Sequence, residues 1–152
     1  MPEFLGEYEA TLDSKGRFLL PAGFKKQLKE GESTFVFCRG MEKHLYLYPK
    51  SSWEPIMAKI MALNDFDPKV RAFRRQFLGG ATEVDIDSAG RLLLPPTLKE
   101  YADLLKDIIL ASAGNMIEIW NAGKYKKLFE DMTPEEFSQL ASEVMAPKPG
   151  TE

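Results

Sequence analysis

Hydrophobic and polar positions alternate over short stretches of the chain that are separated by tight turns, and this pattern indicates a largely β structure. In the first such stretch, residues 8–12 and 17–20 predict two strands around a turn at Asp13–Gly16. Asp at the start of the turn and Gly three residues later favour a type I turn closed by a left-handed residue. A helix over residues 21–30 follows, with Gly31 as the expected stop, because proline suits the first helical position and glycine the position beyond the end.

The same stretch continues with a second hairpin and a second helix. Residues 33–39 and 44–48 read as strands, and a helix opens at Pro49 and reaches about Ala62. The order β-β-α-β-β-α is then predicted again for residues 82–131. The pattern therefore describes one unit that occurs twice.

Two further helices are predicted, one between the units and one after the second. Asp67 is a suitable N-cap with Pro68 at the first helical position, and Phe73 and Phe77 lie on one helical face. Thr133 begins the last helix, since the sequence TPEE supplies a cap, a proline and acids in the first turn.

These elements define the expected organisation of the chain. It consists of repeat 1 at 7–62, a connecting helix at 63–80, repeat 2 at 82–132, a C-terminal helix at 133–146 and a frayed tail at 147–152. A unit of about 50 residues buries little core by itself. We therefore expect the copies to pack on each other around a pseudo-twofold axis, as one α+β, mainly β, domain.

A nine-residue motif makes the repetition explicit. Residues 13–21 read DSKGRFLLP and residues 87–95 read DSAGRLLLP, so seven of nine positions are identical at an offset of 74. A weaker likeness continues beyond the motif and aligns Trp53 with Tyr125. Self-similarity at a fixed offset is typical of a duplicated structural unit.

The doubled D-S-x-G-R motif resembles that of the MraZ family of bacterial transcriptional regulators, which are tandem versions of the swapped-hairpin fold of AbrB-like regulators. The resemblance implies that hairpins from the two copies interleave into a small barrel with flanking helices. It implies a DNA-binding role for the arginine of each motif, here Arg17 and Arg91. It also implies a homo-oligomer, closed into a ring, that binds double-stranded DNA. The sites would be promoter repeats ahead of a cell-division and cell-wall gene cluster that includes the regulator's own gene.

The residues themselves are compatible with this role. An arginine directly after a tight turn leaves the surface at a fixed position, and its guanidinium can form two parallel hydrogen bonds to a guanine edge or a phosphate. Lys15 adds positive charge in the first turn, where the second turn has Ala89. We therefore expect Arg17 and Lys15 to contribute more to DNA binding than Arg91.

The other motif residues are expected to be structural. We interpret Asp13 and Asp87 as turn residues whose carboxylates accept backbone N–H groups, and Gly16 and Gly90 as conformational. Each arginine could also pair with the aspartate of its own motif and stiffen the hairpin. Taken alone, the residues leave the structural and the binding role of the arginines about equally open.

The distribution of charge favours the N-terminal half as the DNA-binding face. The net charge is −3, but residues 1–80 carry 13 Lys and Arg against 10 Asp and Glu, whereas residues 81–152 carry 7 against 13. Lys25, Lys26 and Lys29 could form a basic patch for phosphates, although a solvated helix face explains them equally well. The basic cluster at 69–75 could contact DNA or the acidic C-terminal half of a neighbouring subunit.

Sequence signals of catalysis are missing from the chain. It contains no phosphate loop, dinucleotide fingerprint or zinc-ligand spacing, and it has one Cys and one His. We therefore predict no enzyme activity, metal, cofactor or small-molecule substrate, and we interpret Cys38 as a packing residue. No signal-peptide pattern or membrane-length apolar run is present, so we expect a cytoplasmic, nucleoid-associated protein with no membrane partner.

Two functional hypotheses follow. The first is a sequence-specific DNA-binding transcriptional regulator that uses the motif arginines. The second is a protein-interaction or antitoxin-like module whose main partner is another protein, motivated by the net acidity and by the aromatic residues Tyr46, Tyr48 and Trp53. Salt separates them, because binding through phosphates weakens steeply as salt rises.

Overall fold

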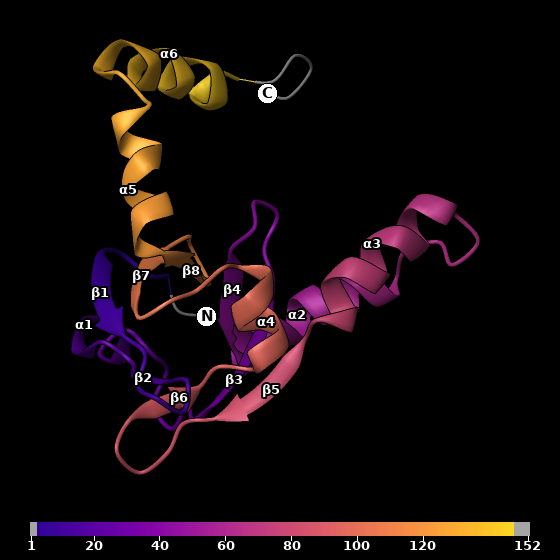
Figure 1. The fold of residues 1–152 in the computed structure, drawn as a ribbon. Helices are drawn as coiled ribbons and strands as arrows, with labels where there is room; N and C mark the ends of the chain where they lie inside the picture. Colours follow the sequence, from indigo (N-terminus) through magenta and orange to yellow (C-terminus); the bar gives the residue numbers. More distant parts are fainter. Residues whose placement is uncertain (1–2, 148–152) are drawn as a thin grey trace. The chain divides into compact units, whose positions relative to one another are not determined.

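The computed structural model describes residues 3–147, and Figure 1 traces its helices and strands. The chain divides into two compact units, one ending at Ala122 and one beginning at Gly123. The strands of the described residues all lie in the first unit, so this unit holds both sequence motifs.

The first unit contains a six-stranded antiparallel sheet and a separate two-stranded ribbon. The six strands, in spatial order, are β1 (Glu7–Thr11), β7 (Asp107–Ser112), β8 (Ile117–Asn121), β4 (Leu45–Pro49), β3 (Thr34–Arg39) and β5 (Thr82–Asp85). The ribbon consists of β2 (Arg17–Leu19) and β6 (Arg91–Leu93). The strands match the sequence prediction to within a few residues.

The two copies exchange strands throughout the first unit. β1 of the first copy pairs with β7 of the second, and β5 of the second copy pairs with β3 of the first. β2 and β6, which carry the motif arginines, pair with each other. Neither copy could form this arrangement alone, and the expectation of a mainly β, swapped-hairpin fold is confirmed.

The main core lies between the ribbon and one face of the large sheet. Phe18 and Leu92 point inward from the ribbon and are fully buried, as are Phe35 and Phe37 from β3. Burying a side chain of this size stabilises a fold by about 1.5–3 kcal/mol. Because both copies contribute side chains to this one core, the burial of Phe18 and Leu92 holds the ribbon against the sheet.

A short helix follows each ribbon strand. The second is α4 (Pro96–Tyr101), and the first, α1, covers only Ala22–Lys25. The helix predicted over residues 21–30 is therefore wrong in length. After Phe24, the one fully buried residue of α1, Gln27 N donates to Phe24 O, and the chain continues in a tighter turn instead of an α-helix.

Two longer helices of the first unit pack on the other face of the sheet, where they contact β3 and β4. They are α2 (Lys50–Met61) and α3 (Pro68–Gly79), and the side chain of Asp67 caps α3 by accepting from Lys69 N. The face predicted for this helix is confirmed, since Phe77 is buried and stacks on Trp53 with 5.7 Å between ring centroids. A second aromatic cluster therefore forms on this side of the sheet.

The second unit is helical. It contains most of α5 (Ala122–Glu130) and all of α6 (Pro134–Met145). Thr133 is the N-cap of α6, as predicted, and its hydroxyl accepts from Glu136 N. No residue of either helix is buried. Most of the tail predicted at 147–152 lies outside the described residues.

None of the helices among residues 3–147 has both the length and the apolar character needed to cross a lipid bilayer.

Candidate nucleic-acid interface

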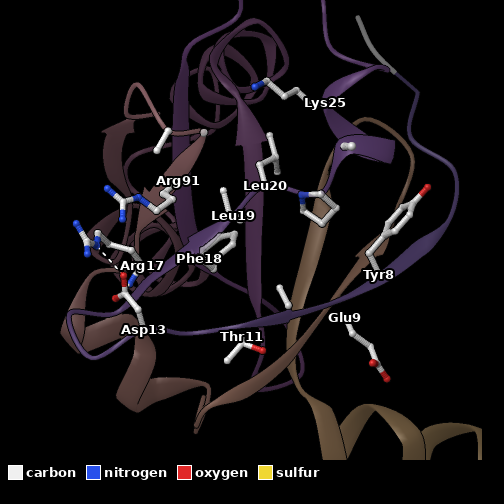
Figure 2. Close-up of a pocket in the computed structure, with 15 residues that line it drawn as sticks. Tyr8, Glu9, Thr11, Asp13, Arg17, Phe18, Leu19, Leu20, Lys25 and Arg91 are labelled. Carbon is white, nitrogen blue, oxygen red and sulfur yellow. Dashed lines mark hydrogen bonds and ion pairs between the residues drawn. The ribbon is translucent and has the colours of Figure 1, made fainter.

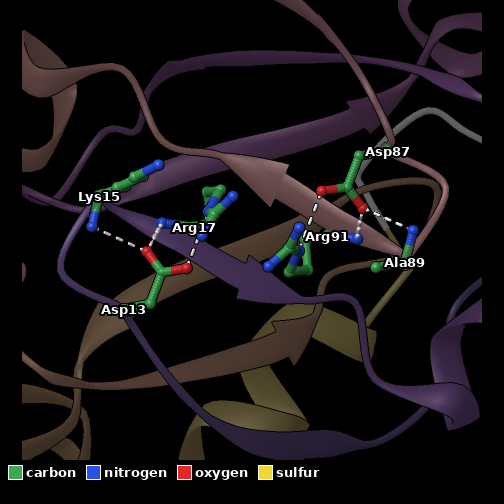
Figure 3. Close-up of polar contacts among 6 residues, drawn as sticks. All are labelled: Asp13, Lys15, Arg17, Asp87, Ala89 and Arg91. Atoms are coloured by element: carbon green, nitrogen blue, oxygen red, sulfur yellow. Dashed lines mark hydrogen bonds and ion pairs between the residues drawn. The ribbon is translucent and has the colours of Figure 1, made fainter.

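The first D-S-x-G-R turn is held together by its own aspartate. Asp13 Oδ1 accepts hydrogen bonds from Lys15 N and Arg17 N, both at 2.9 Å, and Asp13 Oδ2 accepts from Arg17 Nε at 2.8 Å (Figure 3). Gly16 closes the turn with φ = +83°, a conformation that side-chain-bearing residues rarely adopt. The aspartate thus organises the turn and orients the guanidinium with one carboxylate.

The second turn repeats this geometry almost atom for atom. Asp87 Oδ1 accepts from Ala89 N at 2.9 Å and from Arg91 N at 2.8 Å, and Asp87 Oδ2 accepts from Arg91 Nε at 2.9 Å (Figure 3). Gly90 has φ = +81°. The third motif residue donates only its backbone N–H to the aspartate. The turn therefore has the same hydrogen bonds with Lys15 as with Ala89.

These contacts change the titration of both aspartates. The backbone hydrogen bond from Arg17 is the largest cause that holds the pKa of Asp13 below its ordinary value of 3.8, and the Arg17 side chain acts in the same direction. Arg91 lowers the pKa of Asp87 in the same way. Both carboxylates are therefore charged at neutral pH, and each stays paired with its arginine.

The ribbon places the two arginines on one outward face. Arg17 lies opposite Leu93, and Leu19 lies opposite Arg91, so all four side chains share the face away from the core. Leu19 and Leu93 are 60% and 50% exposed. Figure 2 shows the guanidiniums of Arg17 and Arg91 beside each other and pointing to the same side. The terminal nitrogens of both groups make no hydrogen bond to another described residue.

A shallow hollow of about 750 Å³ adjoins this face. It is bordered by both arginines, by Tyr8 of β1 and by Lys25 of α1, which Figure 2 shows extending from the neighbouring helix. The sheet edge, the ribbon and the helix therefore frame one open surface, whose charged lining residues are Arg17, Lys25 and Arg91 together with Glu9 and Asp13.

The exchange of strands also brings Lys25 of the first copy to the second turn. A Cβ atom placed on Gly90 would lie 3.5 Å from Lys25 Nζ. The second turn therefore has a lysine neighbour even though its own third position is Ala89. Sequence reasoning placed Lys25 only in a general basic patch, because nothing in the sequence indicates which turn it approaches.

Other candidate residues are buried in the first unit. Cys38 is fully buried, and burial raises the pKa of its thiol far above its ordinary value, which fits a packing role. Tyr46, Tyr48 and Trp53, which motivated the protein-partner hypothesis, lie in the second aromatic cluster and are less than a tenth exposed. Across residues 3–147, no three metal-ligating side chains are grouped together.

The single histidine takes part in a buried cluster. His44 stacks on Trp120 with 4.4 Å between centroids, and its Nε2 lies 3.4 Å from Glu118 Oε2, an ion-pair separation and not a well-formed hydrogen bond. Trp120 Nε1 donates to Glu118 Oε1 at 2.8 Å. Burial acts to raise the pKa of Glu118, but the two polar neighbours outweigh it and lower that pKa. The cluster joins the residue directly before β4 of one copy to β8 of the other.

The model of the MraZ protein family, which its description calls antitoxin-like, matches the chain twice, at residues 4–76 and 77–146. The chain belongs to the MraZ family. Similar proteins named transcriptional regulator MraZ occur in Cytophaga hutchinsonii and Oenococcus oeni. The first is 42% identical over 95% of both chains, and the second is 40% identical over 93% of this chain and 96% of its own.

The two MraZ matches divide the chain within α3. Each matched segment contains one D-S-x-G-R turn and one ribbon strand. Because β2 and β6 pair only with each other, neither MraZ segment contains a complete arginine face. The surface described above therefore depends on both copies.

Proposed function

We propose that this chain is a sequence-specific DNA-binding regulator of transcription, and that the outward face of the β2–β6 ribbon is its contact surface. The observation that carries the proposal is the pair of arginines, Arg17 and Arg91, which the exchanged strands hold side by side on one ribbon. Membership of a family whose relatives are named transcriptional regulators supports it.

A two-stranded ribbon has dimensions that the major groove of B-DNA admits. The Nε of each arginine is held by its own aspartate, so the guanidinium is oriented before DNA arrives and loses less conformational freedom on binding. The two terminal nitrogens can donate in parallel to a guanine edge or to a phosphate. The sequence left a structural and a binding role open for each arginine. In this proposal Nε has the structural role, and the two terminal nitrogens have the binding role.

The residues around the two arginines offer contacts both to the phosphates and to the bases of DNA. Lys15 in the first turn and Lys25 beside the second add positive charge near the ribbon. The exposed Leu19 and Leu93 offer apolar contacts of the kind made with thymine methyl groups. One ribbon covers only a few base pairs, so useful affinity requires several copies acting together.

The proposal also covers the oligomeric state of the chain and the DNA sites that it binds. A homo-oligomer, closed into a ring, would present several ribbons to repeated sites, and linked binding events multiply affinity without new contacts. We propose that these repeats stand in the promoter of the chain's own gene, ahead of a cell-division and cell-wall gene cluster. This target is the one that the resemblance to the MraZ family implies, and the chain belongs to that family.

The test is a binding titration of the full chain against DNA from upstream of its own gene, with unrelated DNA as competitor, at two salt concentrations. We expect competitor-resistant binding that weakens with salt at a log–log slope of about −0.9 per phosphate neutralised. The double variant Arg17→Ala/Arg91→Ala should lose specific binding while keeping its circular dichroism spectrum and its assembly. No preference of the unchanged protein for that DNA would contradict the proposal.

The matched control removes positive charge elsewhere. Lys126→Ala changes an exposed lysine on α5. We expect this variant to retain the preference for the upstream DNA. Equal loss in the control and in the arginine variant would assign the effect to overall charge and not to the ribbon.

A further inference from the structure

The apolar face of α6 is left uncovered by the residues of its own unit that the structure describes, 123–147. Phe137, Leu140 and Val144 are spaced as i, i+3 and i+7 and therefore lie on one side of the helix. They are 65%, 44% and 69% exposed. An amphipathic helix gains most of its stability from packing this face, so a helix with every such residue exposed is typical of an element that docks elsewhere.

The first unit has an apolar groove of matching character. It lies beside α2 and α3, has a volume of about 350 Å³, and is walled by aromatic and aliphatic side chains. These walls include Tyr46, Tyr48, Ile56, Ile60, Phe73 and Phe77. Exposed Met41 and Leu63 stand at its rim together with Lys59. A groove of this kind accepts a helix through anchors spaced at i, i+3 and i+7.

The charges beside the groove and on α6 are opposite. α3, which supplies Phe73 and Phe77 to the groove, contains four basic residues and no acidic one. The segment 130–145, which includes α6, contains five acidic residues and no basic one. Complementary charge of this kind steers two surfaces together and selects their orientation.

We propose that α6 of one copy docks, through its Phe137–Leu140–Val144 face, in the α2–α3 groove of a second copy of this chain. The inference deepens the proposed function, because it rests on a regulator that works as an assembly and names the surfaces that join its subunits. The helix and the groove are different surfaces of the chain. The contact is therefore heterologous, and repeated contacts of this type close into a ring where the rotation between copies allows it.

The groove and the DNA-binding face use different side chains. None of the groove residues belongs to the ribbon, and none of the ribbon residues lines the groove. Loss of docking can thus be measured apart from loss of the arginine contacts.

Cross-linking between chains tests the proposal directly. All variants carry Cys38→Ser, which removes the natural thiol. One preparation carries Leu63→Cys at the groove and another carries Val144→Cys on α6, and the two are mixed and oxidised. We expect a disulfide-linked dimer of the two different chains. Its yield should exceed the control by about tenfold, because docking raises the effective concentration of the two thiols to the millimolar range.

The control places the thiol on the opposite side of the same helix, with Ser142→Cys in place of Val144→Cys. A cross-link that forms equally well with this control would overturn the proposal. So would a mixture that yields none, while a single chain carrying both Leu63→Cys and Val144→Cys forms an internal disulfide. The latter result would assign the groove to the chain's own helix.

A second measurement does not depend on thiol geometry. Phe137→Glu/Leu140→Glu should lower the mass found by light scattering relative to the unchanged chain, and Gln139→Glu/Ser142→Glu on the polar side should not. An unchanged chain that is monomeric at micromolar concentration would refute docking. If the cross-link forms and the mass falls as expected but upstream DNA is not preferred, docking stands and the regulatory function fails.

Discussion

The two copies of the repeat agree closely at their turns and differ at their helices. Asp13 and Asp87 each accept two backbone N–H groups and one arginine Nε, at distances that match within 0.1 Å. The helix pairs share no such likeness. α3 buries Phe77 against the sheet, whereas α6 buries nothing. A turn contains all of its own hydrogen-bond partners, but an amphipathic helix depends on the surface it meets.

The largest expected effect tests the difference between the helices. Phe77→Ala removes a ring that contacts Trp53, Tyr46 and Phe73, and should lower the free energy of unfolding by about 3 kcal/mol. Phe137→Ala on α6 should change the stability of a single chain by less than about 0.5 kcal/mol. Urea denaturation at several protein concentrations measures both and separates any contribution from assembly.

An equal loss in the two variants would mean that Phe137 is packed within its own chain. A loss for Phe137→Ala that appears only at high protein concentration would instead agree with docking between copies.

The next effect tests whether the two turns are equal in function as well as in shape. Each of Arg17→Ala and Arg91→Ala should weaken specific DNA binding by about 10- to 150-fold, the range expected for one bidentate contact. The charge pattern predicts the larger loss for Arg17, whereas the matching geometry and the position of Lys25 predict similar losses. Parallel titrations of the two variants at one salt concentration decide between them.

Circular dichroism checks that each arginine variant is folded. A second pair of variants separates charge from hydrogen-bond geometry, because Arg17→Lys and Arg91→Lys keep the positive charge but cannot donate two parallel hydrogen bonds. Recovery of full affinity with lysine would mean that charge alone is read, and the bidentate contact would then be wrong.

A smaller effect tests the lysines that flank the two turns. Lys15→Ala and Lys25→Ala should each reduce the steepness of the salt dependence by about 0.9 if each lysine neutralises one phosphate. Lys126→Ala on α5 should leave the slope unchanged. If Lys15→Ala alone changes the slope, the second turn lacks a phosphate contact, and the ranking of Arg17 above Arg91 gains support.

Local features of the fold could be predicted from the sequence. The strands, the cap at Asp67 and the left-handed glycines each depend on a few neighbouring residues. The duplication indicated that the two copies pack on each other, and the resemblance to the MraZ family implied that their hairpins are swapped. The short α1 was not predicted, because Pro21 and Gly31 are equally compatible with a full helix or with a tight turn between them.

Contacts between distant residues could not be predicted in detail. The pairing of Arg17 with Leu93, which places the arginines on one face, depends on the register between strands 74 residues apart. The approach of Lys25 to Gly90 depends on the same exchange. The aromatic residues Tyr46, Tyr48 and Trp53 motivated the protein-partner hypothesis, but they are buried where α2 and α3 pack on β3 and β4. Alternation along a strand does not show which face a helix will pack against.

The smallest expected effect is acid sensitivity of the turns. The pKa of each motif aspartate is lowered in the folded chain, so its contribution to stability is present above 3.8 and is lost as the pH falls through the lowered value. Asp13→Asn and Asp87→Asn should each flatten the loss of stability below this pH, and by similar amounts, because the two turns share one set of hydrogen bonds. Urea midpoints between pH 5 and pH 2.5 (about the range in which such carboxylates titrate) measure the effect. A flatter acid response in only one of the two variants would show that the two turns differ in energy despite their matching geometry.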